Sequence, residues 1–174
     1  VGNVNDVPEI SEVLQYPGTI DEDTERTFEF IPLDVDSDNS ALSVTVASLD
    51  INLVPSDSII IEPTGTIMSG DTVRVTLKPA LDQFGTTSIM LDIMDDDLAT
   101  LSNDWSFTVE NVNDAPVVGD VGAQQTWEDQ PLQITLNVTD PENNYDDITI
   151  WADIFENEGI VSLNTNANNV LTDD

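Results

Sequence analysis

The sequence predicts an all-β protein made of Greek-key β-sandwich repeats in tandem, with an incomplete second copy. Apolar and polar residues alternate along several short segments, as they do in strands that have one buried and one solvated face. Turn-forming residues separate these segments at intervals of about a dozen residues, which is typical of a sandwich. Short motifs also recur in the same order roughly a hundred residues apart, which indicates a repeat.

Five segments of the first hundred or so residues carry the alternation most clearly. They are residues 27–35, 42–46, 73–77, 88–94 and 105–109. The side chains that we expect to face inward are Phe28, Phe30, Leu42, Val44, Val46, Val73, Val75, Leu77, Ile89, Leu91, Ile93, Trp105, Phe107 and Val109. Burial of each contributes about 1.5–3 kcal/mol, so a unit of about seven strands has enough apolar material to fold alone, though only marginally once the conformational entropy of the chain is counted.

Three motifs define the repeat. The segment Val4-Asn5-Asp6-Val7-Pro8 recurs 108 residues later as Val112-Asn113-Asp114-Ala115-Pro116. The pair Glu22-Asp23 recurs 106 residues later as Glu128-Asp129. The segment Val35-Asp36-Ser37-Asp38-Asn39 aligns 104 residues later with Thr139-Asp140-Pro141-Glu142-Asn143. Small loop deletions explain the drift in spacing.

These motifs divide the chain into three parts. Residues 1–7 are expected to be the tail of a preceding repeat, residues 8–114 a complete repeat and residues 115–174 a partial second repeat. Strands are expected over 132–138, 148–150 and 160–163 in the partial repeat. The sequence leaves open whether this half-unit is truncated, lacks disordered residues or is completed by another chain.

Composition excludes several functional classes. The 174 residues include 35 Asp and Glu but only 3 Lys and Arg, which gives a net charge of −32. A polyanion repels nucleic-acid phosphates and anionic lipid headgroups, and no apolar run reaches the roughly 18 residues that a membrane helix needs. The chain has no Cys and no His, so disulfides, Cys/His zinc sites and Ser-His-Asp triads are impossible.

An enzyme is not expected. Paired carboxylates serve glycosidases when they lie about 5–9.5 Å apart. The acidic residues of this chain, however, lie in repeated motifs, and a repeated unit rarely hosts one unique active site.

The acidic residues gather at predicted strand ends and between the repeats. Alternate loops of a sandwich meet at the same end, so these groups can converge. Calcium takes six to eight oxygen ligands from carboxylates, amides and backbone carbonyls, and it would relieve the repulsion among them. The alternatives are a solvated acidic surface suited to a salty habitat and, at residues 34–38, a polar turn.

The motifs resemble the cadherin-like tandem repeats of large bacterial surface proteins and adhesins. The segments that carry the resemblance are Val112-Asn113-Asp114-Ala115-Pro116, Glu22-Asp23-Thr24, Asp34-Val35-Asp36-Ser37-Asp38, and Pro79-Ala80-Leu81-Asp82-Gln83-Phe84-Gly85 followed by Asp95. Membership would imply an immunoglobulin-like sandwich of the cadherin type, end-to-end stacking, an extracellular or cell-surface location and Ca²⁺ between neighbouring domains.

The resemblance also implies a ligand set for the joint after the first repeat. That set comprises Glu22 and Asp82, with Asp95 or Asp97, then Asn111, Asn113 and Asp114 of the linker, and Asp140 and Glu142 of the next repeat. The upstream joint would use Asn5, Asp6, Asp36 and Asp38. The chain departs from the linker of animal cadherins at Asn111 and Ala115, so the number of ions per joint is left open.

The leading functional interpretation is a non-catalytic, calcium-stabilised module that extends a surface protein and takes part in cell or matrix adhesion. Its expected partners are neighbouring repeats of the same chain, with neither nucleic acid nor membrane insertion. The alternatives are calcium-dependent polysaccharide binding and homotypic pairing. Aromatic residues for sugar stacking are few: Trp105 is expected in the core, Trp127 in packing at the joint, and Trp151 is open.

Overall fold

A computed structural model describes residues 4–36, 41–142, 148–150, 162–164 and 170–172. The chain divides into two compact units, Val1–Val112 and Asn113–Asp174. Each unit is described by itself below.

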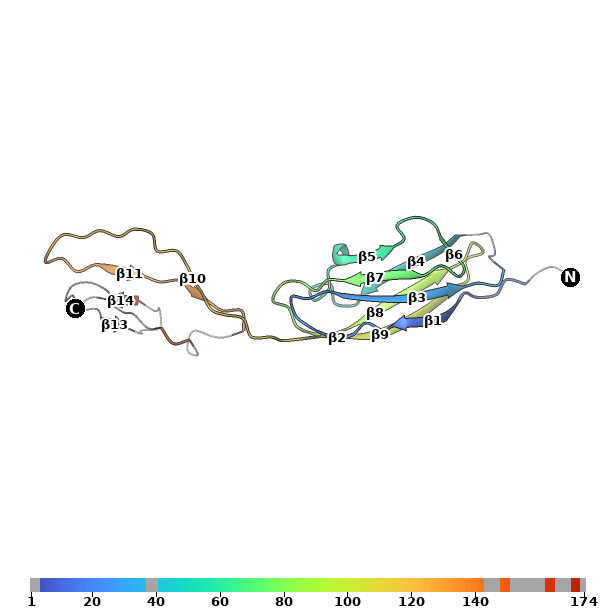
Figure 1. Ribbon diagram of the computed structural model, residues 1–174, viewed down its shortest axis with the longest axis horizontal. Coiled ribbons are helices and arrows are strands. Elements are labelled where there is room, and N and C mark those ends of the chain that lie inside the picture. The colour runs from blue at the N-terminus through green and yellow to red at the C-terminus, as the bar shows by residue number, and fades with distance from the viewer. Residues whose placement is uncertain (1–3, 37–40, 143–147, 151–161, 165–169, 173–174) are drawn as a thin grey trace. The chain divides into compact units, whose positions relative to one another are not determined.

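The first unit is a sandwich of two sheets that face each other (Figure 1). One sheet has the order β1-β3-β7-β5 and the other the order β2-β9-β8-β4-β6. The strands are β1 (Glu9–Gln15), β2 (Gly18–Asp21), β3 (Arg26–Leu33), β4 (Ala41–Ser48), β5 (Ile59–Glu62), β6 (Ile67–Met68), β7 (Val73–Leu77), β8 (Gly85–Met94) and β9 (Thr100–Glu110). The 3₁₀ turn η1 (Ser56–Ser58) precedes β5.

The strand order is that of an immunoglobulin-like Greek-key sandwich. The alternation predicted the Greek-key sandwich, and the resemblance implied its immunoglobulin-like type. β1 pairs with β3 in one sheet, whereas β2 pairs in parallel with β9 in the other. Only Tyr16 and Pro17 separate β1 from β2, and Gly18 follows with a φ of 67°. Proline ends the first pairing and glycine accepts the left-handed backbone, so the chain crosses between sheets within two residues.

The core lies between the sheets and is built mainly from the residues that alternation assigned to it, to which Leu53, Val54 and Ile67 are added. Phe28, Phe30 and Phe107 are fully buried, together with the inward side chains of β7 and β8. Val44 and Trp105 are partly buried and pack against this core. Trp105 meets Phe28 edge-on, with ring centroids 5.3 Å apart and an interplanar angle of 86°. Edge-to-face contact is a favoured geometry for aromatic pairs.

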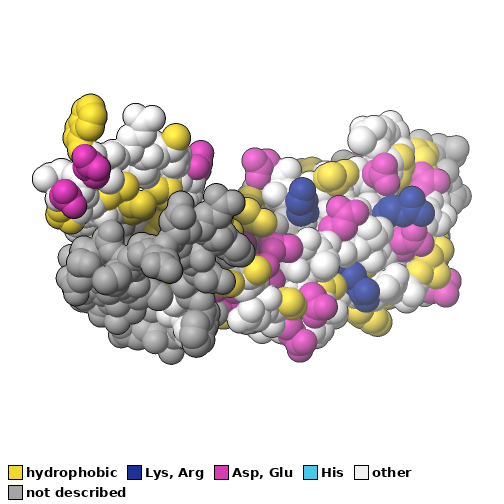
Figure 2. Space-filling model, turned by 60° about the vertical axis from the view of Figure 1, so that its left-hand side comes forward, with side chains coloured by type: hydrophobic (Ala, Val, Ile, Leu, Met, Phe, Trp, Pro, Cys, Tyr) yellow, Lys and Arg dark blue, Asp and Glu magenta, His cyan; other side chains and the backbone are white. Residues whose placement is uncertain are grey.

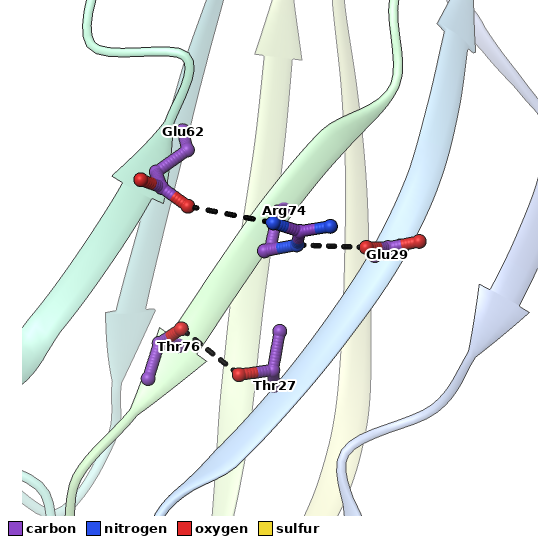
Figure 3. Close-up of polar contacts among 5 residues, drawn as sticks. All are labelled: Thr27, Glu29, Glu62, Arg74 and Thr76. Carbon is purple, nitrogen blue, oxygen red and sulfur yellow. Dashed lines mark hydrogen bonds and ion pairs between the residues drawn. The ribbon is translucent and has the colours of Figure 1, made fainter.

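Polar side chains cover the outer face of the β1-β3-β7-β5 sheet. In Figure 3, Arg74 of β7 donates from Nε to Glu29 Oε1 of β3 at 2.8 Å. Nη1 of the same guanidinium lies 3.9 Å from Oε2 of Glu62 in β5. The hydrogen bond from Arg74 to Glu29 raises the pKa of the arginine. Two residues further along the same pair of strands, the hydroxyl groups of Thr27 in β3 and Thr76 in β7 form a hydrogen bond of 3.0 Å. Such exposed pairs set cross-strand register more than they add stability.

The five alternating segments are confirmed as β3, β4, β7, β8 and β9. The sequence prediction missed β1, β2, β5 and β6 as definite strands. β1 carries two register shifts against β3, so its side chains do not follow strict alternation. β2, β5 and β6 are short, with two to four residues each, and too little pattern accumulates in them to be recognised.

The second unit contains β10 (Val117–Val118), β11 (Gln133–Thr135), β12 (Val138–Thr139), β13 (Ser162–Asn164) and β14 (Val170–Thr172). The prediction of a continuous strand over 132–138 is wrong. β11 pairs with β14, whereas β12 pairs with β10, and the segment breaks where it changes partner. Residues 148–150 form no strand, and β13 only overlaps the strand expected over 160–163, where 160 and 161 lie outside the described residues.

Both units share one strand pair, and it corrects the alignment of the third motif. In the first unit Glu9 pairs with Leu33 of β3, and in the second Val117 pairs with Thr139 of β12. The residues after these strands therefore correspond at an offset of 106 residues, so Asp34 matches Asp140. The sequence comparison paired Asp36 with Asp140, two residues out of register, because it matched the letters of a variable loop rather than the strand before it.

Phe107→Ala is expected to lower the free energy of unfolding of the first unit by about 3–5 kcal/mol, because it leaves a cavity between the sheets. Phe84→Ala is a matched control. That ring is 54% exposed, so its removal should change stability by less than about 0.5 kcal/mol. Urea denaturation followed by circular dichroism measures both, and equal effects would contradict the position of the core.

Candidate functional site

A buried carboxylate, Glu22, lies at the end of the first sandwich where β9 finishes. Its exposed fraction is 4%. The backbone N–H of Glu22 donates to the carbonyl of Glu110 at 2.9 Å, and Glu22 Oε1 accepts from the N–H of Val112 at 2.6 Å. Glu22 Oε2 is also buried and has no hydrogen-bond partner among the described residues. A buried charged oxygen without a partner is costly, so this atom is suited to a cation.

Two further carboxylates lie at the same end of the sandwich. The backbone N–H of Asp82 donates to Asp23 Oδ1 at 3.2 Å, and carboxylate oxygens of the two residues lie within 4.8 Å of each other. Asp23 and Asp82 have φ angles of 58° and 54°. Aspartate tolerates this left-handed region better than most residues do. We call Glu22, Asp23 and Asp82 the C-terminal cluster of the first unit.

The opposite end of the same sandwich holds an N-terminal cluster of Asn5, Asp6, Asp34, Asp36 and Asp95. Asp34 and Asp95 are 4% and 3% exposed. Asp95 accepts from the N–H of Ala99 at 2.8 Å and from the Asn5 side-chain amide at 2.9 Å.

The remaining members of the N-terminal cluster form a chain of backbone-to-carboxylate bonds. The N–H of Asp6 donates to Asp36 Oδ2 at 2.7 Å, and the N–H of Asp36 donates to Asp34 Oδ1 at 2.8 Å. Ser69 fixes the backbone of Asp34 by accepting from its N–H and donating to its carbonyl. Residues that precede β1 are thus held on the loop that follows β3.

The second unit repeats this chain of hydrogen bonds. The N–H of Asp114 donates to Glu142 Oε2 at 2.9 Å, and the N–H of Glu142 donates to Asp140 Oδ1 at 3.1 Å. Glu142 Oε1 is buried and has no hydrogen-bond partner among the described residues. The match of Asp114, Glu142 and Asp140 to Asp6, Asp36 and Asp34 supports the corrected alignment.

The structure places the predicted ligands in different surroundings. Glu22 and Asp82 lie at one end of the first unit, as expected. Asp95 does not join them, because β8 runs from Gly85, opposite Val109, to Met94, opposite Thr100, and so delivers Asp95 to the far end. Asp97 lies exposed in the turn after β8, at that same far end.

The other predicted ligands belong to the linkers and to the second unit. Asn111 is exposed at the end of β9, and Asp38 lies outside the described residues. Asn113 donates from its side chain to the carbonyl of Asp114 at 2.7 Å. Asp114, Asp140 and Glu142 occur together in the hydrogen-bond chain of the second unit.

Asp23 and Asp34 were not in the predicted ligand set, although each lies in one of its clusters. The signal for Asp34 was hidden by the misaligned third motif. The signal for Asp23 was present in the recurring pair Glu22-Asp23 and Glu128-Asp129, whose second members have matching φ angles of 58° and 61°.

The surface around these sites is acidic. Figure 2 shows Asp and Glu side chains spread over the visible face, with Lys and Arg side chains at only a few places. Arg74 is engaged by Glu29, and Arg26 donates to the carbonyl of Tyr16 at 3.0 Å. With 3 basic residues against 35 acidic ones, the protein has few cations of its own to place beside its carboxylates.

The aromatic residues separate into core and surface. Trp105 packs against the core, as predicted. The prediction that Trp127 is packed is wrong, because its side chain is 85% exposed. Trp151 lies outside the described residues.

Comparisons with known proteins return likenesses of fold only. No protein-family model matches the chain, and the search of curated proteins finds no match. Domains 5–6 of the S-layer protein SbsC align with 96% of this chain and 85% of that chain, at 15% identity and a TM-score of 0.43.

Two further solved structures are also similar in fold. Domains 4 and 5 of SbsC align with 59% of this chain at 14% identity and a TM-score of 0.42, and the alignment covers only 53% of that chain. The PKD domain of an M14-like peptidase from Thermoplasmatales archaeon SCGC AB-540-F20 aligns with 61% of this chain and 98% of its own, at 14% identity and a TM-score of 0.40. Function is therefore argued from the clusters themselves.

A search of the described part of the chain for helices that could cross a membrane finds none of sufficient length and hydrophobicity.

Asp95→Ala is expected to lower the free energy of unfolding by about 1–3 kcal/mol, because it removes the acceptor of the Ala99 N–H in a buried turn. Asp97→Ala, two residues along in the same turn and exposed, should change it by less than about 0.5 kcal/mol. Denaturant titration of both variants at one ionic strength measures these two changes in the free energy of unfolding. A harmless Asp95→Ala would contradict a structural role for this carboxylate.

Proposed function

We propose that this chain is a non-catalytic, calcium-stabilised repeat module of a bacterial cell-surface or secreted protein, which acts as an extender and in cell or matrix adhesion. The observation that carries the proposal is Glu22 Oε2, a buried carboxylate oxygen without a hydrogen-bond partner among the described residues. Neighbouring repeats of the same chain are its expected partners.

The chemistry of the C-terminal cluster favours a hard cation. Its candidate ligands are the carboxylate oxygens of Asp23 and Asp82, which lie within 4.8 Å of each other, and the buried Oε2 of Glu22. The chain offers neither thiolate nor imidazole to a softer metal. Calcium accepts irregular sets of oxygen ligands at 2.3–2.6 Å, whereas magnesium demands near-ideal octahedral geometry and retains its waters. A flexible set of carboxylates therefore favours calcium.

The clusters also explain how a cation would stiffen a repeat protein. Val112 is held by Glu22 of the first unit, and Asp114 is held by Glu142 of the second. Asn113 alone lies between these two anchored backbone positions. A cation on Glu22 would hold the carboxylate that fixes Val112, and would therefore limit the freedom of the linker where domain joints are otherwise flexible.

A spacer role is consistent with the distribution of the acidic residues. The two hydrogen-bond chains at Asp6 and Asp114 are equivalent and occur once per repeat. An active site would instead need a constellation unique to one unit. Each repeat therefore fixes its own preceding linker by the same device.

Calcium is expected to raise the melting temperature, and excess chelator to lower it. By mass action a single site contributes about 2.7 kcal/mol when free calcium is 100 times its dissociation constant. Glu22→Gln should abolish most of this increment, because the amide keeps an oxygen for the Val112 N–H but loses the charge that binds the ion. Differential scanning calorimetry with and without calcium measures the increment.

The matched control is Asp104→Asn, which removes the same charge from an exposed position in the middle of β9 and should retain the calcium increment. Sodium chloride at equal ionic strength and magnesium at equal concentration separate specific binding from screening of the net charge of −32. Identical melting curves in calcium and in chelator, or equal increments for Glu22→Gln and the parent chain, would contradict the proposal.

A further inference from the structure

The strongest feature outside the carboxylate clusters is an exposed tryptophan, Trp127, in the second unit. Its side chain is 85% exposed. Among the described residues, Gln124, Gln125, Thr126 and Trp127 line a hollow of about 660 Å³.

The outward position of Trp127 follows from its place in the repeat. The left-handed residues Asp23 and Asp129 mark the same turn in the two units, with φ angles of 58° and 61°. At the resulting offset of 106 residues, Trp127 corresponds to Asp21 in β2, which is exposed in the complete sandwich of the first unit. By this correspondence Trp127 occupies a position that lies outside the core in the first unit, and its own side chain is exposed as well.

Gln125 lies beside Trp127 in the lining of the hollow. Along β2 the half-buried residues Gly18 and Ile20 alternate with the exposed residues Thr19 and Asp21. Gln125 corresponds to Thr19, and in the second unit both Gln125 and Trp127 are exposed and line the hollow. Gln125 has no side-chain hydrogen bond to any described residue, which leaves its donor and acceptor for a ligand.

The neighbouring hydrogen bonds shape the segment. Gln124 Nε2 donates to the carbonyl of Val121 at 2.7 Å, which orients its amide. The Thr126 hydroxyl donates to the carbonyl of Gln130 at 3.2 Å, and the Gln130 N–H donates to the carbonyl of Trp127 at 3.2 Å. These contacts fold residues 126–130 into a turn that fixes the backbone beneath the indole.

We propose that Trp127 and Gln125 form a binding platform for a neutral polysaccharide. An aromatic ring offers a flat apolar face to the C–H groups of a sugar, and amides and hydroxyls offer paired donors and acceptors to its hydroxyls. Glu128, Asp129 and the net charge of −32 repel sulfated or uronic acid chains. No carboxylate is among the described residues that line the hollow, so we expect the binding to be independent of calcium, and it goes beyond the spacer role proposed above.

The test is co-sedimentation of the full chain with insoluble cellulose, chitin and mannan, in calcium and in excess chelator. The expected result is retention on at least one of them under both conditions. Trp127→Ala should weaken retention about tenfold, as loss of an aromatic anchor does, and Trp127→Phe should restore most of it. Leu98→Ala truncates another exposed apolar side chain, 72% exposed, in the first unit and should leave retention unchanged.

Several results would overturn this assignment. They are no retention on any of the three polysaccharides, retention that Trp127→Ala does not alter, and retention that chelator removes. Binding of polylysine in place of the polysaccharides, lost in Trp127→Ala, would assign the indole to a cationic partner and would equally overturn it. The calcium proposal is decided separately by the melting curves, so failure of one is distinguishable from failure of the other.

Discussion

The placement of carboxylates inside the ends of a sandwich constrains the rest of this structure. Glu22, Asp34 and Asp95 are each less than 5% exposed in a protein that has only 3 basic residues. The burial of a charge is tolerated only when hydrogen bonds or counter-charges replace water. Backbone N–H groups satisfy Asp34 and Asp95 in part, and they satisfy one oxygen of Glu22. The other oxygen of Glu22 is the point at which a cation has most to contribute.

The same hydrogen bonds couple the fold to the linkers. A carboxylate that accepts from a linker N–H turns the segment between repeats into part of a domain, and the structure uses this device at Asp6 and again at Asp114. Glu22 binds the linker that follows β9 in the same way, because its carboxylate accepts a hydrogen bond from the Val112 N–H. The acidic motifs are therefore structural elements of the repeat as well as a source of charge.

The inward and outward faces of the strands contribute different interactions. Inward residues such as Phe28 and Phe107 supply the core, and Trp105 packs on them. Outward positions do not have to be apolar, so they hold cross-strand pairs such as Arg74 with Glu29. Position 127 holds an exposed indole. A functional surface can therefore change from repeat to repeat without altering the core, as the replacement of Asp21 by Trp127 illustrates.

The sequence by itself determined the fold class, the core strands and the residues that recur at the ends of the repeats. Strict alternation in β7, β8 and β9 places the alternate apolar residues of each strand on one side, because a strand has a period of two, and so it buries Val73, Val75, Leu77, Ile89, Leu91, Ile93 and Phe107 together. Motif recurrence likewise singled out Glu22, and the resemblance to cadherin-like repeats added Asp82.

Only the tertiary structure decided which carboxylates share an end and which side chains face solvent. The direction of β8 carries Asp95 away from Glu22, and that direction depends on how the strands alternate between sheets. The pairing of β10 with β12 set the alignment of Asp140 with Asp34, because loop lengths vary while strand register does not. The exposure of Trp127 follows from its equivalence to an outward position of β2, whose four residues carry too little pattern to reveal it.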